Sequence, residues 1–381
     1  MEISTESTLL AGAAQLANLA IPSRSTMPTL TAMLLAADQN GLTLSGTDLD
    51  ISIQIHLPLL PQTVTDERAG IRLYQPGKAM VPAQTFVDLL RRLPATIVRL
   101  HTSDNETTHL QAGRTQAQLR GFDPQSYPAL PTFPSHVDFQ INADLLSSLI
   151  RHSIYAVAHD ELRPMLTGLY FAAKDGQLTV IATDSHRLVR LTAALDTPVS
   201  FPGLVLPARS LQELDRALDA QEQVEVAFVH NQVLFQTPRF LFSSRLLDGQ
   251  YPDTSRIVPT AYPTYVVVDA NEMGAALERV ILIARENTNQ VVRLHIAPEQ
   301  LRLSAVSPTL GQVEEELLPL QFEGQPLDLA CNAHYLAEAL RNTTAEEVRI
   351  SLTGPESPFV LTAGEVTQAD AVHLVLPVRI Y

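Results

Sequence analysis

Asp184, Ser185 and His186 are the side-chain types of a nucleophilic hydrolase, and they follow one another directly in the chain. In such a relay a carboxylate orients the histidine, and the histidine takes the proton of the serine hydroxyl. The residues around them alternate as in a β-strand, where adjacent side chains point to opposite faces. We therefore expect these three side chains not to form a relay among themselves.

The segment from Gly70 to Ala79 superficially resembles a phosphate-binding loop. Such a loop has four residues between its glycines and a serine or threonine after its lysine. Here six residues separate Gly70 from Gly77, and alanine follows Lys78. The 11 histidines lack the spacing of metal ligands, and a single cysteine cannot build a cysteine-based zinc site. The sequence predicts no catalytic residue, no metal site and no cofactor.

The composition is that of a folded protein with more than one domain. The chain has 381 residues, of which 45% are hydrophobic and 18% charged. Its formal net charge of −15 argues against nucleic acid, because phosphate binding depends on lysine and arginine. The start has no basic region typical of a signal peptide, and no stretch is apolar enough to span a membrane. With only Cys331, the chain suits a reducing compartment, so we expect a cytoplasmic location.

One pattern recurs along the chain at intervals of about 125 residues. An apolar strand end is followed by a helix with apolar residues on one face, beginning at Met80, Val205 and Leu329. Further matching strand or strand–helix segments begin at Asp138, Tyr265, Leu42, Leu178 and Leu301. The sequence therefore predicts three copies of one α+β unit.

Proline-rich joins near residues 127–134 and 258–263 separate the three units. The predicted domains are 1–131, 132–259 and 260–381. The predicted helices are 8–20, 84–92, 143–152, 208–219, 271–285 and 332–341.

The repeat also suggests how the domains assemble. The edge strand of a sheet has unpaired backbone groups that can pair with another strand, so head-to-tail joining of like domains gives an arc. Two arcs related by a two-fold axis close into a ring.

Several motifs of the chain match those of one known family. Residues 163–168 read RPMLTG and residues 182–188 read ATDSHRL. Further motifs are LSGTDLD at 44–50, RSTMP at 24–28, SRLLDGQYPDTSRIVP at 244–259 and LPVRI at 376–380. Together they resemble, in order and spacing, the motifs of the bacterial beta sliding clamp family. The departures are Ser185 for a usual glycine, Tyr251 for phenylalanine, Thr254 for tyrosine, and the additional Tyr381.

The resemblance implies a clamp fold in which helices line the inside of a ring and sheets form its outside. It implies a processivity factor that encircles duplex DNA, independently of DNA sequence, as a head-to-tail homodimer. The implied partners are the replicative DNA polymerase, a clamp loader and other clamp-binding repair and replication proteins. The loader, and not the clamp, hydrolyses ATP in this family, so no catalysis is expected.

The same resemblance assigns residues to three surfaces. Client peptides are expected in a cleft between the second and third domains, lined by Leu166, Thr183, Ser185, His186, Arg187, Leu188, Pro252, Arg256, Ile257, Pro358, Leu376, Pro377, Val378 and Arg379. DNA is expected to meet Arg24, Arg91, Arg92, Arg151, Arg209, Arg279 and Arg341. The dimer is expected to join the first domain near Leu119 to the third near Ile283. The six predicted helices carry no net charge, which suits a surface along which DNA slides.

Two other classes of protein remain open on the sequence alone. A hydrolase centred on Asp184 and His186 would lose turnover when His186 is replaced by alanine. A protein scaffold that no longer encircles DNA would not be retained on any DNA. For the cleft itself, the alternative is that its leucines and isoleucines are simply core residues.

Overall fold

The structure, a computed structural model, describes residues 1–61, 70–103, 106–160, 162–287, 289–363 and 369–379. The chain forms two compact units. The first unit consists of residues 1–144 with 209–246, and the second of residues 145–208 with the chain from 247 onward. All six predicted helices are confirmed, each with ends within two residues of those expected.

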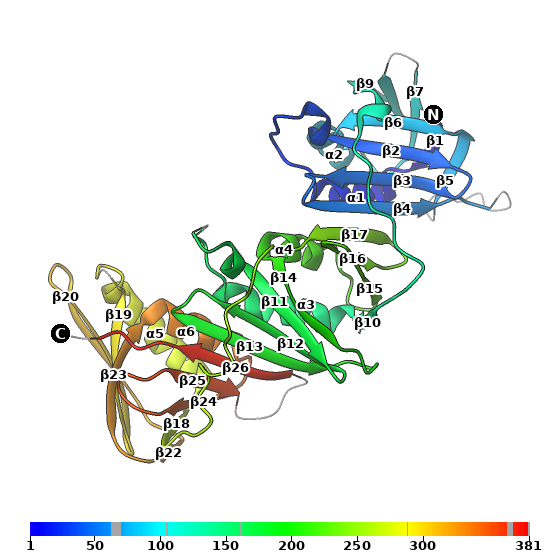
Figure 1. The fold of residues 1–381 in the computed structure, drawn as a ribbon. Helices are drawn as coiled ribbons and strands as arrows, with labels where there is room; N and C mark the ends of the chain where they lie inside the picture. Colours follow the sequence, from blue (N-terminus) through cyan, green and yellow to red (C-terminus); the bar gives the residue numbers. More distant parts are fainter. Residues whose placement is uncertain (62–69, 104–105, 161, 288, 364–368, 380–381) are drawn as a thin grey trace. The chain divides into compact units, whose positions relative to one another are not determined.

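The three repeats share one order of elements, in which a strand and a helix are followed by strands, a second helix and three more strands (Figure 1). The first repeat contains β1 (Glu2–Glu6), α1 (Ser7–Asn18), η1 (Pro28–Thr31), β2 (Ala32–Asp38), β3 (Gly41–Thr47), β4 (Ile51–Pro58), β5 (Ile71–Gln75), β6 (Gly77–Pro82), α2 (Ala83–Arg91), β7 (Ile97–Thr102), β8 (Thr107–Ala112), β9 (Thr115–Arg120) and η2 (Pro124–Ser126). The second contains β10 (Phe139–Asn142), α3 (Ala143–Ser153), η3 (Ile154–Ala156), η4 (Pro164–Thr167), β11 (Gly168–Lys174), β12 (Gln177–Thr183), β13 (Arg187–Ala194), β14 (Phe201–Pro207), α4 (Ala208–Ala217), β15 (Gln223–Val229), β16 (Gln232–Gln236) and β17 (Phe240–Arg245). The third contains β18 (Thr264–Asp269), α5 (Ala270–Ala284), β19 (Val291–Ala297), β20 (Gln300–Ser307), β21 (Gly311–Leu317), β22 (Gln321–Glu323), β23 (Leu327–Asn332), α6 (Ala333–Asn342), β24 (Glu347–Leu352), β25 (Phe359–Ala363) and β26 (Ala369–Val375).

Each unit contains one large antiparallel sheet that joins two repeats. In the first unit the strand order is β10-β15-β16-β17-β4-β3-β2-β6, and Phe242 of β17 lies opposite Ile53 of β4. In the second unit the order is β14-β11-β12-β13-β26-β25-β24-β18-β22, and His373 of β26 lies opposite Val189 of β13. We call these two strand pairs the first junction (β17–β4) and the second junction (β13–β26). Two smaller sheets, β5-β1-β7-β8-β9 and β21-β20-β19-β23, complete the units.

The helices α5 and α6 form because their N-termini are capped and one face of each is apolar. The side chain of Asp269 accepts hydrogen bonds from the first amides of α5, and that of Asn332 does the same for α6. Their apolar faces pack against each other and, with the inward-facing residues of β19, β20 and β24, form a buried core. In the first unit, α1 packs against α2, β3 and β4 in the same way.

The segment from Gly70 to Ala79 forms strands and not a phosphate-binding loop. Ile71–Gln75 pairs with β1, and the lysine lies in β6, opposite Ala36 of β2. A phosphate loop needs a turn that leads into a helix, where amide groups converge on the anion. The backbone amides are used here in sheet pairing.

Candidate functional site

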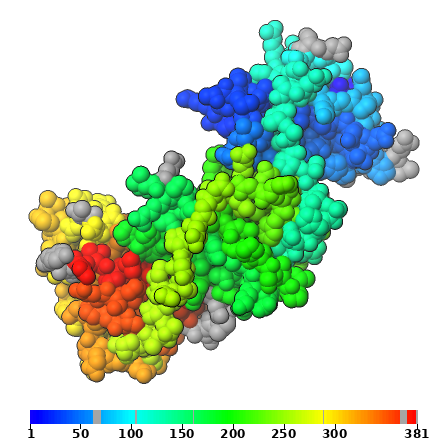
Figure 2. All heavy atoms as spheres, in the orientation of Figure 1, coloured from blue at the N-terminus to red at the C-terminus, as the bar shows by residue number. Residues whose placement is uncertain are grey.

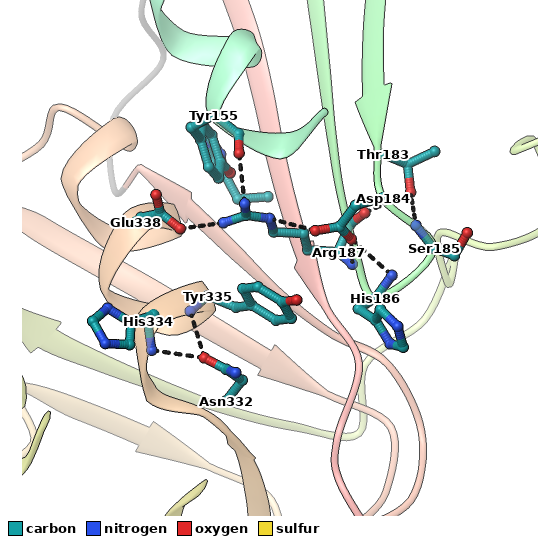
Figure 3. A network of polar contacts seen from close by, with 11 residues as sticks. Tyr155, Thr183, Asp184, Ser185, His186, Arg187, Asn332, His334, Tyr335 and Glu338 are labelled. Atoms are coloured by element: carbon teal, nitrogen blue, oxygen red, sulfur yellow. Dashed lines mark hydrogen bonds and ion pairs between the residues drawn. The ribbon is translucent and has the colours of Figure 1, made fainter. Parts of the chain in front are cut away.

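Several of the expected cleft residues, from Thr183 to Leu188, form or adjoin the turn between β12 and β13. Asp184, Ser185 and His186 form this turn and are not part of a strand, so the premise of our argument against a relay was wrong. Thr183 donates its hydroxyl to the carbonyl of Arg187 at 2.5 Å. Asp184 Oδ1 accepts the amides of His186 at 2.9 Å and Arg187 at 3.0 Å (Figure 3). The turn is therefore held by its own side chains.

The three side chains of the turn have separate partners. The backbone φ of Ser185 is +80°, a conformation that glycine adopts more readily, which explains why glycine is usual in the family motif. Arg163 donates to the Ser185 hydroxyl oxygen at 2.7 Å, a contact that glycine lacks. The His186 ring stacks on Tyr335 at 6.3 Å between centroids, and Asp184 pairs with Arg187 at 3.0 Å. No Ser–His–Asp relay is formed among these residues.

The last strand and the residues after it extend the site to α6. Leu376 donates its amide to the His186 carbonyl at 2.9 Å, and Val378 donates to the Ala330 carbonyl at 2.7 Å. Pro377 bridges to Cys331 at the end of β23. The segment 376–378, which we call the tail, therefore runs from the β12–β13 turn to the start of α6.

Two residues near the tail were not expected from the sequence. Asn332 caps α6 with bonds to the amides of His334 at 2.9 Å and Tyr335 at 3.2 Å. This cap places the Tyr335 ring beside His186 (Figure 3). Burial raises the pKa of the Tyr335 hydroxyl, and the carboxylate of Asp184 adds to that shift. The segment had been noticed only as a repeat, and no local signal pointed to a binding role.

The structure divides the apolar cleft residues into buried and accessible ones. Leu166 is 4% and Leu188 2% exposed, packed with Tyr251 and Leu374 in one core cluster. Both side chains therefore lie in the buried core of the second unit. Ile257 is 40% exposed. Leu376, Pro377, Val378 and Pro358 are half-buried, whereas Pro252, Arg256 and Arg379 are exposed.

The connection between the second and third repeats covers this core cluster. Tyr251 stacks on Tyr170 at 5.1 Å between centroids, and Val258 and Tyr262 pack against the same cluster. Figure 2 shows this yellow-green segment as a strap across the surface of the unit. Burial raises the pKa of the Tyr251 hydroxyl. The exposed Pro252, Arg256 and Ile257 therefore lie on a segment that is anchored to the core cluster.

The turn between β3 and β4, at the first junction, has the same hydrogen bonds as the β12–β13 turn, although other side chains around it differ. Thr47 donates to the Ile51 carbonyl at 2.7 Å, and Asp48 Oδ1 accepts the amides of Asp50 at 3.0 Å and Ile51 at 2.9 Å. Leu49 has the same φ of +80° as Ser185. A hollow of about 560 Å³ beside this turn is lined by Thr47, Leu49, Asp50, Ile51, Ser52, Pro128, Ala129, Leu130, Pro131, Thr132, Val229, Gln232, Leu234, Ser243 and Arg245. The chain therefore contains an internal counterpart of the second-junction site.

Most of the arginines expected to face DNA have carboxylate partners. Arg209 lies 3.1 Å from Asp48, Arg341 3.5 Å from Glu278, and Arg92 3.6 Å from Asp88. Arg279 forms two hydrogen bonds to Glu315, at 2.6 and 2.7 Å. Arg151 also has an interaction. Arg24 and Arg91 are exposed and have no ion pair with any residue that the structure describes.

The two residues expected at the dimer interface are not themselves prominent on the surface. Leu119 of β9 is 7% exposed, and Ile283 of α5 is half-buried. Their neighbours are more accessible: Leu282 is 54% and Leu310 50% exposed. β9 and β21 are each the last strand of their sheet within the described ranges.

The described part of the chain contains no cluster of three histidine, cysteine, aspartate or glutamate side chains suited to a metal ion. No helix in that part combines the length and apolar composition that crossing a membrane requires.

Comparisons with known proteins agree along the whole chain. Residues 1–131, 140–253 and 255–379 match the N-terminal, central and C-terminal domains of the DNA polymerase III beta subunit. The beta sliding clamp of Bacillus subtilis is 37% identical over 366 residues, 95% of each chain, and that of Halalkalibacterium halodurans 35% identical over 367 residues, again 95% of each. The crystal structure of the Bacillus subtilis sliding clamp superposes with a TM-score of 0.94 at 35% identity, and that of the Streptococcus pyogenes beta subunit with 0.94 at 29%, each over 100% of both chains. With three matching domains in the family's order, the chain belongs to the bacterial DNA polymerase III beta subunit family, the beta sliding clamps.

Proposed function

We propose that this protein is a ring-shaped processivity clamp, which encircles duplex DNA as a head-to-tail homodimer and tethers the replicative polymerase and other clients at the second junction. It is a non-catalytic subunit, because its task is topological and needs no bond to be made or broken. The observation that carries the proposal is the full-length membership in the clamp family. The repeated junctions add a physical argument for how two copies join.

The joining rule follows from the two junctions. In both junctions the last strand of a repeat pairs with a strand of the preceding repeat: β17 pairs with β4, and β26 pairs with β13. β4 and β13 are each the third of three consecutive strands that pair with one another, β2-β3-β4 and β11-β12-β13. The same two positions in the remaining repeats are β9 and β21, which have no neighbour on their outer side among the described residues. When β9 of each copy pairs with β21 of the other, all four edge strands of the two copies gain a hydrogen-bonding neighbour. The two identical contacts are related by a two-fold axis and close a ring.

The repeat also predicts the register of this pairing. Ala117, Phe242 and His373 are equivalent positions in the last strands of the three repeats. Each pairs with the equivalent residue of the strand before it, which is Leu110, Phe235 or Leu361 respectively. Val313 similarly matches Ile53 and Val189. We therefore place Ala117 opposite Val313 of the second copy. In that register Gln118 lies opposite Gln312, and Gln116 opposite Glu314.

Charge and apolar surface support the same pairing. β9 contains no acidic residue, follows Arg114 and ends at Arg120, whereas Glu314 and Glu316 lie on β21. Opposite charges on two edges favour their encounter and select the register. Apolar surface for burial is provided by the exposed Leu310, which directly precedes β21, and by the exposed Leu282 of α5, a helix that contacts β21.

Retention on DNA of different topology tests the proposal directly. Protein loaded by the clamp loader and ATP onto nicked circular DNA is expected to remain bound through gel filtration in high salt. Cutting the circle once is expected to release it, because a ring slides off a free end. Equal retention on circular and linear DNA would contradict the topological mechanism.

Arg24 and Arg91 are expected to contribute most of the arginine contact with DNA phosphates. The other candidate arginines already have partners, and an arginine paired with a carboxylate releases fewer counterions on DNA binding. The double variant Arg24→Ala/Arg91→Ala should reduce the slope of log Kd against log salt by roughly one to two, about one per lost phosphate contact. The matched control is Arg209→Ala/Arg341→Ala, which removes two ion-paired arginines. An equal change of slope in the control would contradict this ranking.

A further inference from the structure

Arg187 was expected to line the cleft, and its guanidinium lies in the interior. Only 6% of its side chain is exposed. Nε donates to Asp184 at 3.0 Å, NH2 donates to the Tyr155 carbonyl at 2.6 Å, and NH1 donates to Glu338. The guanidinium carbon lies 5.2 Å from the centre of the Tyr155 ring and 4.5 Å from that of Tyr335 (Figure 3). Every nitrogen of this side chain therefore has a partner within the protein.

The Arg187 network, meaning these contacts with Asp184, Tyr155, Tyr335 and Glu338, joins two walls of the site. Asp184 belongs to the β12–β13 turn, and Glu338 belongs to α6. Tyr335 lies on the same helix, three residues before Glu338, so both side chains lie on one helical face. The stacking of His186 on Tyr335 therefore depends on the distance that the arginine sets between turn and helix.

The turn itself does not need an arginine. At the first junction, Ile51 occupies the equivalent position and is 3% exposed. The hydrogen bonds of Thr47 and Asp48 reproduce those of Thr183 and Asp184. An apolar residue thus suffices to form this turn. A buried guanidinium loses its hydration and needs carboxylates to compensate, so its presence at the second junction serves the link to α6.

We propose that Arg187 is a positioning residue of the client cleft, which fixes the spacing between the His186 turn and the Tyr335 face of α6 without contacting the peptide. The inference rests on the proposed function, because it assumes that clients bind at the second junction. It predicts that Glu338, whose carboxylate accepts a hydrogen bond from the arginine, controls client affinity through Tyr335.

The test is a double-mutant cycle on the full-length protein. The probe is a fluorescein-labelled peptide from the clamp-binding segment of the replicative polymerase, and its affinity is measured by anisotropy. Glu338→Gln alone and Tyr335→Ala alone are each expected to weaken binding about tenfold, close to 1.4 kcal/mol by the conversion of affinity to free energy. In the Tyr335→Ala background, Glu338→Gln is expected to weaken binding less than twofold. Glu338→Asp, which keeps the charge on a shorter side chain, is expected to have an intermediate effect and serves if Glu338→Gln does not fold.

Two further measurements separate positioning from general destabilisation. The ring-proton resonance of His186, shifted by the Tyr335 ring, is expected to move toward its unstacked value in Glu338→Gln. The matched control is Glu213→Gln, since Glu213 has the same place on α4 and pairs with Arg216 at 2.9 Å. This control should leave both the resonance and the peptide affinity unchanged.

The outcomes distinguish the inference from the function on which it rests. Independent tenfold losses from Glu338→Gln and Tyr335→Ala, multiplying in the double variant, would overturn the positioning role. The positioning role would also be overturned if Glu338→Gln binds the peptide as tightly as the unaltered protein while Tyr335→Ala binds it weakly. In that case the proposal that clients bind in the cleft would remain valid. If deletion from Leu376 onward and Tyr335→Ala both leave affinity unchanged, the client site lies elsewhere and both proposals fail.

Discussion

Gln118→Pro is expected to turn the homodimer into a monomer at concentrations at which the unaltered protein is dimeric. Gly121 donates its amide inward to Glu106 at 3.0 Å, so the alternate residues Arg120, Gln118 and Gln116 direct their amides to the outer side of β9. At the two junctions, the equivalents of Arg120 donate across to the neighbouring strand, each at 2.9 Å: Arg245 to Asp50 and Leu376 to His186. By the same rule, the proposed pairing has the Gln118 amide donating to the second copy.

Proline at this position removes that donor and places its ring toward the partner strand. The fold of the subunit is expected to survive, because an edge strand tolerates proline where the lost amide faces solvent. The proposed ring has two interfaces, so each dimer would lose two such bonds, about 1 kcal/mol apiece, and would suffer steric conflict in addition. We expect the dimer dissociation constant to rise on the order of 100-fold.

Analytical ultracentrifugation over a range of concentrations measures this shift. Gln118→Ala is the matched control, because it removes the exposed side chain and keeps the amide. The control should remain a dimer. If Gln118→Pro is as dimeric as the control, β9 is not the interface strand.

The second prediction concerns acid stability and depends on His373. Its side chain is 0% exposed, and its Nδ1 lies 2.8 Å from the Tyr155 hydroxyl. Burial, together with the neighbouring charge of His152, lowers the pKa of His373 from 6.5 to about 4. The native protein therefore keeps this ring neutral at a pH where the unfolded chain protonates it.

This difference makes the native state less stable as the pH falls. Above pH 6.5 both states hold His373 neutral, and its titration contributes nothing to the pH dependence. Between pH 6.5 and about 4 the unfolded chain takes up a proton that the native protein does not, so the free energy of unfolding decreases. The loss saturates near pH 4 at about 3 kcal/mol, since one pKa unit corresponds to about 1.4 kcal/mol.

His373→Phe tests this contribution, because the equivalent residue of the second repeat is the fully buried Phe242. The variant should lose less stability than the unaltered protein between pH 7 and pH 4 when unfolding by urea is followed for the second unit. His152→Phe removes the neighbouring charge that helps to lower the pKa of His373, and it should reduce the loss of stability by less than His373→Phe does. Identical pH profiles for His373→Phe and the unaltered protein would contradict the assignment.

The sequence determined the threefold repeat, the six helices and the family. Helix ends and apolar faces are local properties, set by caps such as Asp269 and Asn332 and by the period of a helix. The motifs around Thr183–Leu188 and the last residues of the chain are also contiguous, so their resemblance to the clamp family could be recognised without a structure.

Only the tertiary structure decided which of these residues are accessible. Leu166 and Leu188 are buried, and Arg187 is enclosed by Asp184 and Glu338, although Arg187 and Leu188 stand in the same motif as the exposed His186. Glu338 and Tyr335 lie about 150 residues away from Arg187 in the sequence, and strand pairing at the second junction brings them to it. The partners of a charged side chain are set by such long-range pairing, and no local pattern of residues contains that information.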